Sequence, residues 1–156
     1  MKLSKIDIIL TVSVIVLSLL FFKLFLDDVN AISFNKNVKS TATITFKKNN
    51  AQRQWTNSLR WERLQNNSPV YNGDTIRTAN DSEAALFFED ETKLDLADNT
   101  LVQIRSALKS NTIEFMGGSI FLKSGKSSEK GMTVNTKDGS IINIEKNSIA
   151  SLIQNG

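Results

Sequence analysis

The sequence predicts an all-β domain that follows a single transmembrane helix. Three observations indicate this fold class: one long apolar segment near the amino terminus, a series of short segments in which apolar and polar residues alternate, and clusters of Asn, Gly, Asp and Ser between those segments. Short strands at nearly regular spacing are typical of a compact sandwich, an irregular barrel or a short solenoid-like stack, here of about ten strands.

The amino-terminal apolar segment is long enough to cross a membrane. As a helix, residues 6–26 would span roughly 30 Å at about 1.5 Å per residue, and only hydroxyl side chains interrupt the apolar stretch 8–22. Lysines precede the segment and aspartates follow it, so the distribution of basic residues predicts a cytoplasmic amino terminus. We therefore expect a single-pass protein of the inner or cytoplasmic membrane with its β domain outside, in the periplasm if the cell has two membranes.

This anchor divides the chain into a short cytoplasmic tail, the membrane span, a stalk and a β domain, expected at residues 1–5, 6–26, 27–39 and 40–156. A secretory signal peptide is an open alternative, because Val-Asn-Ala at residues 29–31 would permit cleavage after Ala31. The apolar run exceeds the ~7–15 residues of a signal-peptide core, which favours an uncleaved anchor.

Composition limits the chemistry that the chain can perform. Cysteine and histidine are absent, which excludes a lipidated cysteine, disulfide bonds, a thiol nucleophile and the commonest general base. The net charge of +3 belongs to the part after the anchor, since the segment through Ala31 carries equal numbers of acidic and basic side chains. This excess suits a soluble domain near anionic polymers, but it does not indicate a nucleic-acid groove. We expect no catalytic residues, no cofactor, no metal site and no nucleic-acid partner.

Period-two alternation predicts the strands of the outer domain in order. They are expected at residues 41–46, 51–56, 74–78, 83–89, 92–96, 101–105, 112–116, 119–123, 132–136, 140–145 and 148–153. Glycines are expected at corners, including Gly117 and Gly118 between two strands, and Asp138-Gly139 is a hairpin signal for a type I′ turn. A helical turn is expected near residues 58–64. A polar hairpin loop, rather than a Ser-Lys catalytic pair, is expected at 123–128.

An ordered set of short motifs covers nearly all of residues 41–152. The central motif is Gly73-Asp74-Thr75-Ile76-Arg77-Thr78, which Trp61 precedes. The later motifs are Ser82 to Phe88, Asp90-Glu91-Thr92, Asn99-Thr100, Gly118-Ser119-Ile120 and Met132 to Thr136. In this order the motifs resemble the FecR domain, an extracytoplasmic β module of bacterial envelope signalling proteins. The resemblance implies an extracytoplasmic location and a role in signal relay or regulation.

Two features depart from the family pattern. The acidic turn has glutamate where the family has glycine, so a positive φ angle at Glu91 would be costly. The regulators for which the family is named also carry a cytoplasmic helical segment that grips a sigma factor, whereas only residues 1–5 are expected in the cytoplasm here. We therefore expect no anti-sigma role through such a segment unless another subunit supplies it.

Aromatic and basic residues between positions 53 and 77 form the candidate partner-binding surface. Aromatic rings with arginines nearby could provide a platform for a peptide or a sugar polymer. The alternative is that these rings anchor the core, as large aromatic residues do in small β domains. The candidate residues are Arg53, Trp55, Arg60, Trp61, Tyr71 and Arg77.

The acidic residues are expected to have structural roles rather than to bind a metal ion. Asp74 follows Gly73 at a corner, where its carboxylate can accept backbone N–H bonds. The acidic run around residues 89–91 lacks the Asp-x-Asp-x-Asp-Gly pattern of a calcium loop. We expect it to form a solvated edge that discourages strand addition.

These observations predict a membrane-anchored, non-catalytic module that recognises another envelope protein, through strand addition at an exposed sheet edge, in signal relay or regulation. The alternative is a structural envelope module that binds peptidoglycan or another surface polymer. A signalling role predicts one stoichiometric protein partner, whereas a structural role predicts sedimentation with cell-wall material that high salt weakens.

Overall fold

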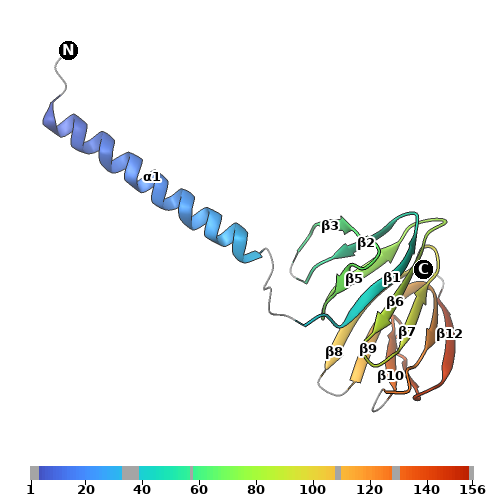
Figure 1. Cartoon of the computed structure of the whole chain (residues 1–156). Helices are drawn as coiled ribbons and strands as arrows, with labels where there is room; N and C mark the ends of the chain where they lie inside the picture. The colour runs from blue at the N-terminus through green and yellow to red at the C-terminus, as the bar shows by residue number, and fades with distance from the viewer. Residues whose placement is uncertain (1–3, 33–38, 57, 108–109, 128–130, 155–156) are drawn as a thin grey trace. The chain divides into compact units, whose positions relative to one another are not determined.

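The computed structural model describes residues 4–32, 39–56, 58–107, 110–127 and 131–154. Within these ranges the chain forms one helix and twelve strands (Figure 1). They separate into two compact units with the boundary between Val38 and Lys39. The first unit contains the helix, and the second contains all of the described strands.

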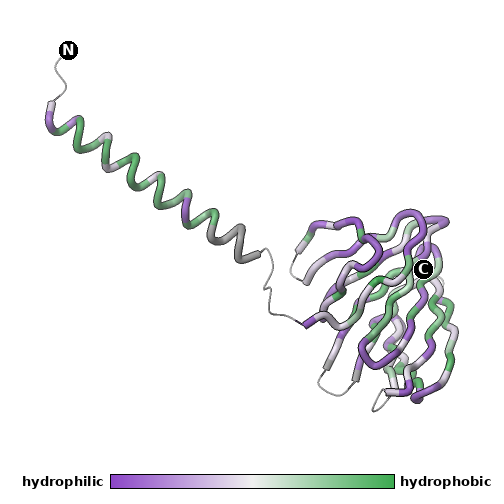
Figure 2. The backbone as a smooth tube through the Cα atoms, viewed as in Figure 1, coloured by the Kyte–Doolittle hydropathy of each residue, from purple (hydrophilic) through white to green (hydrophobic). Residues whose placement is uncertain are grey.

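Helix α1 (Lys5–Ile32) begins with a capping box. The Ser4 backbone N–H donates to Asp7 Oδ2 at 3.0 Å, and the Ile6 N–H donates to Ser4 Oγ at 3.3 Å, which satisfies N–H groups that have no partner within the helix. The stretch Lys5–Leu26 has the length and hydropathy of a membrane span, and Figure 2 shows it as apolar over most of its length. The expected long apolar helix is confirmed.

The helix continues beyond residue 26, where the membrane span was expected to end, and includes the first part of the expected stalk. The rest of the stalk, residues 33–38, lies outside the described residues, as do residues 1–3 of the expected tail. A signal peptide shares the length and apolarity of α1. The uncleaved anchor therefore stays a prediction, and cleavage after Ala31 stays its alternative.

The second unit is built from short strands joined by tight turns. Their bounds are β1 (Ala42–Lys48), β2 (Ala51–Gln54), β3 (Trp61–Arg63), β4 (Pro69–Val70), β5 (Thr75–Thr78), β6 (Glu83–Phe88), β7 (Lys93–Leu96), β8 (Leu101–Ala107), β9 (Ser110–Lys123), β10 (Met132–Thr136), β11 (Ile141–Ile144) and β12 (Ile149–Gln154). The hydrogen-bonded order β3-β2-β5-β8-β9-β7-β6-β1-β4 forms a curled half-barrel. β10 and β12 join it at β9, and β11 pairs with β10. Among the described strands only β9 and β10 pair in parallel.

The long strand β9 joins two layers of this sheet. Its residues 110–117 pair with β8, whereas residues 118–123 pair with β12. We call layer A the strands β4, β1, β6, β7, β12 and the second part of β9, and layer B the strands β3, β2, β5, β8, β10, β11 and the first part of β9. Gly118 lies at the bend with φ +97°, and a Cβ atom there would lie 2.4 Å from Thr100 Cα. Glycine is therefore required at this position.

Both layers contribute side chains to one hydrophobic core. Ile44 of layer A and Ile76 of layer B are each 0% exposed, and alternate residues of their strands face the same core. Phe88 and Phe115, one from each layer, are the largest fully buried side chains. Burial of a side chain of this size contributes roughly 1.5–3 kcal/mol. Because the chain has no cysteine, such burial and the backbone hydrogen bonds hold the domain together.

The all-β class is confirmed, and the curled half-barrel corresponds to the irregular barrel among the expected forms. Two expected elements are wrong. Residues 112–116 and 119–123 belong to one bent strand, since Gly118 turns the backbone without ending its pairing. Trp61–Arg63 forms β3 instead of a helical turn, because it pairs with residues 52–54 of β2. A strand this short shows no alternation that the sequence could reveal.

Two turns differ from expectation in their detail. The Asp138-Gly139 hairpin is confirmed, but only Gly139 of this pair has a positive φ, at +86°, and its N–H donates to the Thr136 carbonyl at 2.9 Å. This is a type I turn followed by a glycine bulge rather than a type I′ turn. Glu91 adopts φ +66°, so the acidic turn takes the left-handed conformation although glutamate replaces glycine. The cost of that conformation is about 1–2 kcal/mol.

The expected polar loop at residues 123–128 is partly buried. Ser124 is 2% exposed, and the Gly125 N–H donates to Thr92 Oγ1 at 2.9 Å. A Cβ atom on Gly125 would lie 1.8 Å from the Asp90 carbonyl oxygen, so this segment packs directly on the acidic turn. Residue 128 lies outside the described residues.

Candidate functional site

The candidate residues gather around β2, β3 and β5, but on two faces of layer B. Side chains at paired positions of neighbouring strands share a face, and Arg53 pairs with the fully buried Ile76. Arg53 therefore lies on the core side, together with Trp55, two residues further along the strand direction. Trp61 and Arg77 lie on the outer face, where Arg77 Cζ is 4.0 Å from the Trp61 ring centroid. The structure thus forms two groups instead of one platform.

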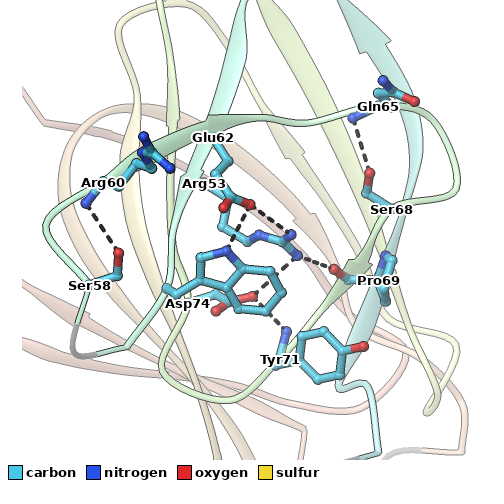
Figure 3. Close-up of polar contacts among 10 residues, drawn as sticks. Arg53, Ser58, Arg60, Glu62, Gln65, Ser68, Pro69, Tyr71 and Asp74 are labelled. Carbon is cyan, nitrogen blue, oxygen red and sulfur yellow. Dashed lines mark hydrogen bonds and ion pairs between the residues drawn. The ribbon is translucent and has the colours of Figure 1, made fainter. Parts of the chain in front are cut away.

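Arg53 is the centre of the inner group (Figure 3). This residue is 8% exposed, its Nη1 donates to the Pro69 carbonyl at 2.6 Å, and its Cζ lies 3.5 Å from the Trp55 ring centroid. Two carboxylates face the guanidinium: Glu62 Oε2 is 3.7 Å from Nη2, and Asp74 Oδ2 is 3.8 Å from Nη1. The buried positive charge is therefore compensated, as burial of an ion requires.

Trp55 and Tyr71 cover this group. Their ring centroids are 5.6 Å apart at an interplanar angle of 28°, and Trp55 Nε1 donates to Glu62 Oε2 at 2.8 Å. Both residues are half-buried. Trp55 at the end of β2 thus contacts β3 through Glu62 and the corner before β5 through Tyr71. These contacts close one end of the hydrophobic core.

Asp74 is the buried acid of the inner group. It is 1% exposed, and its Oδ2 accepts the Tyr71 backbone N–H at 2.9 Å across the turn of residues 71–74. Burial raises the pKa of Asp74 to about 6, although the Tyr71 hydrogen bond and the Arg53 charge oppose this shift. A group with this pKa changes its charge between about pH 5 and about pH 7.

The outer group is smaller and more exposed. Arg77 Nε donates to Gln52 Oε1 at 2.8 Å while its guanidinium covers Trp61. Arg60 is exposed in the segment before β3, and its backbone N–H donates to Ser58 Oγ at 3.1 Å. The Arg60 side chain makes no hydrogen bond or ion pair with either group among the described residues.

A polar cavity lies on the outer face of layer B, where the sequence indicated no site. Its volume is about 630 Å³, and outward-facing residues of β8, β9 and β10 form most of its wall. The lining residues are Thr56, Asn72, Gly73, Gln103, Arg105, Ser106, Thr112, Glu114 and Asn135. Alternation showed that these strands have a polar side, but it could not show which polar residues the pairing would bring together.

An apolar surface lies on the outer face of layer A. Phe46, Phe87 and Phe121 are 49%, 45% and 44% exposed, and Ile149 and Ile153 of β12 are 62% and 76% exposed. We call these five residues the layer A patch. The sequence contains a signal for this patch, because β6 and β9 each carry consecutive apolar residues. Neighbouring residues of a strand point to opposite faces, so some of these apolar side chains must face outward.

The acidic run has separate partners. Glu89 Oε2 lies 2.7 Å from Lys39 Nζ, whereas Asp90 Oδ1 accepts the Thr92 backbone N–H at 3.0 Å. In the part of the chain that the structure describes, no group of three or more Asp, Glu, His or Cys residues could hold a metal ion.

Comparisons with known proteins agree with the motif pattern. The model of the family described as FecR protein matches residues 74–151. An uncharacterized protein of Treponema pallidum (strain Nichols) is 36% identical over 78 residues, which are 49% of this chain and 12% of that longer protein. No solved structure matches the chain. The family match begins at Asp74, so it includes most residues of the cavity and of the layer A patch, but Asp74 alone of the inner group around Arg53.

Proposed function

Because this chain belongs to the FecR family, we propose that it is a membrane-anchored, non-catalytic module that recognises another envelope protein in signal relay or regulation. The observation that carries this proposal is the layer A patch, where large apolar side chains stay exposed beside a sheet edge. Aromatic side chains are enriched in protein interfaces, so three exposed phenylalanines on one face support an interaction site.

Strand pairing places the patch residues in neighbouring rows of one face, with one aspartate and two lysines between them. Phe46 and Phe121 lie in one cross-strand row through β1, β6, β7 and β9. Phe87 lies in the adjacent row, which ends at Ile149 of β12. Aromatic residues are enriched at the centres of protein interfaces, where they supply contact area with little loss of conformational freedom.

Strand β12 is a second feature that supports protein recognition. Its one neighbour among the described strands is β9, and Ile149–Gln154 contains neither a charged residue nor proline. Two other edge strands are shorter and better protected: β4 has two residues and begins with Pro69, and β3 has three residues, two of them charged. The unpaired backbone groups of β12 can therefore accept a strand from a partner.

The helix α1 supports a membrane location for this recognition. A span of this length and hydropathy can anchor the domain, and the lysines before it favour the extracytoplasmic side for residues that follow. The partner class that fits is an envelope protein with an apolar surface or an unpaired strand of its own.

The test is site-specific photo-crosslinking of the full chain in its native membrane. A photoreactive residue replaces Phe87, Phe121 or Ser151 in turn, and Gln52 on the outer face of layer B is the matched control position. We expect one envelope protein, captured at near-equal stoichiometry from the layer A positions and not from Gln52.

A charge at the centre of the patch should abolish this capture. Phe121→Asp places a carboxylate where the partner must exclude water. Because this position is partly exposed but lies opposite Asp95, we expect a loss of stability of about 1 kcal/mol that leaves the domain folded. Thermal unfolding of the variant checks that the domain remains intact. Capture from Gln52 as efficient as from Phe121, or unchanged capture by the folded variant, would contradict the proposal.

A further inference from the structure

We propose that the polar cavity on the outer face of layer B binds a neutral glycan chain. This site goes beyond the protein recognition proposed above and does not depend on it, because the layer A patch and the cavity lie on different layers of the sheet. The cavity volume of about 630 Å³ falls within the ~300–1,000 Å³ of typical ligand pockets. Its lining differs from that of most pockets, because hydroxyl and amide groups replace apolar side chains.

The cavity is built from side chains that hold one another in fixed orientations (Figure 1 shows their strands). Gln103 Nε2 donates to the Gly73 carbonyl at 3.1 Å, and Asn135 Nδ2 donates to Glu114 Oε1 at 3.0 Å. Arg105 Nε lies 3.7 Å from the same Glu114 oxygen. These contacts order the planar groups before any ligand binds, which lowers the entropy cost of binding.

Hydrogen-bonding capacity remains after these contacts. Among the described residues, Glu114 Oε2, Asn135 Oδ1 and Thr112 Oγ1 have no hydrogen-bond partner. Two of these atoms are acceptors, and the threonine hydroxyl can both donate and accept. A sugar hydroxyl also donates and accepts, so it can bind between such groups.

The charge of the cavity excludes other ligand classes. Among the described residues that line it, Arg105 and Glu114 are the charged ones, and their side chains lie 3.7 Å apart, so their charges compensate each other. A phosphate or an acidic polymer would need an excess of positive charge, and an apolar peptide would need apolar walls. A neutral ligand rich in hydroxyl or amide groups fits both conditions.

The surface beside the cavity extends the site from one sugar unit to a chain. Strand pairing aligns Gln103, Thr75, Gln54 and Trp61 in a row that runs across β8, β5, β2 and β3. In the other direction the same row continues through Glu114 to Asn135. At ~4.8 Å per strand the row is roughly 24 Å long, and it combines amides, a hydroxyl and a carboxylate with an aromatic ring at one end. An extended polymer lying across the strands could contact each of these side chains in turn.

The experiment is an NMR titration of the isotope-labelled full chain in detergent micelles. Chitotetraose serves as the neutral glycan, and inorganic phosphate serves as the anionic comparison. We expect chitotetraose to shift the side-chain amide signals of Gln103 and Asn135 in a saturable manner, with a dissociation constant near ~1 mM or below. No shift up to about ten times that concentration, or the same shifts with phosphate, would overturn the proposal.

Variants separate this site from the protein-binding role. Gln103→Ala combined with Asn135→Ala should weaken chitotetraose binding by about tenfold or more, since two ordered hydrogen-bonding groups are removed. Ser151→Ala, which removes a polar side chain on layer A, should bind as the parent chain does. Phe121→Asp should also leave the titration unchanged while it abolishes photo-crosslinking. Full binding by a folded double variant would show that the glycan does not occupy the cavity.

Discussion

Asp74, a buried carboxylate in the corner after β4, should make the stability of the domain depend on pH. Its side chain accepts the Tyr71 N–H and lies beside Arg53, yet burial dominates and raises its pKa to about 6. The ordinary value of the unfolded chain is 3.8. The folded chain therefore binds this proton more tightly, so the contribution to stability is full below about pH 4 and disappears as the pH rises through about 6.

We predict that Asp74→Asn removes this contribution. The asparagine oxygen can still accept the Tyr71 N–H, but it does not titrate. On acidification from about pH 7.5 to about pH 4.5, the parent chain should gain roughly 2 kcal/mol relative to the variant. Urea unfolding of both proteins at the two pH values measures this difference, and the comparison cancels the titration of other groups. A difference that does not change with pH would contradict the raised pKa.

Glu91 adopts a backbone conformation that glutamate disfavours. Its φ of +66° lies in the left-handed region, which the other positive-φ positions fill with Asn, Asp or Gly. The packing of Gly125 on the neighbouring Asp90 carbonyl shows why this turn cannot relax freely. Tertiary contacts therefore impose on glutamate a conformation that the sequence made unfavourable.

At the scale of elements, β9 decides the architecture. It is the only described strand that pairs in both layers, and it changes layer at Gly117 and Gly118. Gly118 has φ +97° and lies against Thr100, whereas a Cβ atom on Gly117 would have nothing closer than 3.9 Å. Position 118 therefore requires glycine, whereas position 117 has room for a Cβ atom.

We predict that Gly118→Ala destabilises the domain by about 2–4 kcal/mol, because the methyl group would overlap backbone atoms in a conformation that alanine disfavours. Gly117→Ala, the matched control, should cost less than about 1 kcal/mol. Chemical unfolding followed by circular dichroism measures both values. Equal effects of the two substitutions would argue against the bend as the reason for glycine at position 118.

At the scale of the whole molecule, the chain joins an apolar helix to a β domain with its own core. If α1 is retained as an anchor, the protein should remain in the membrane pellet after alkaline carbonate extraction, and its intact mass should include residues 1–31. Removal of a signal peptide would instead release a chain that begins at Ile32. Intact-mass spectrometry of the membrane and soluble fractions distinguishes these two results.

The β domain presents two chemically different outer surfaces. The face of layer A carries the exposed phenylalanines, while the face of layer B carries the polar cavity and the row that extends it. If both proposals hold, the domain can contact a protein and a glycan at the same time without competition between them. Binding measurements with Phe121→Asp and with the double cavity variant test the two surfaces independently.

Features that depend on local interactions could be read from the sequence. Apolar length predicted α1, period-two alternation predicted most of the strands, and Asp138-Gly139 predicted a hairpin. The order of short motifs also predicted the family, since each motif is a turn or strand of a few residues. These signals are local because backbone preference and side-chain spacing act over only a few positions.

The contacts between distant side chains depend on how the strands pair in the folded domain. The candidate arginines and aromatic residues separated onto two faces of layer B, because the register of β2 with β5 places Arg53 opposite Ile76. The cavity likewise combines positions from Thr56 to Asn135, and the layer A patch combines four strands. Strand register depends on the burial of a common core, which no short segment encodes alone.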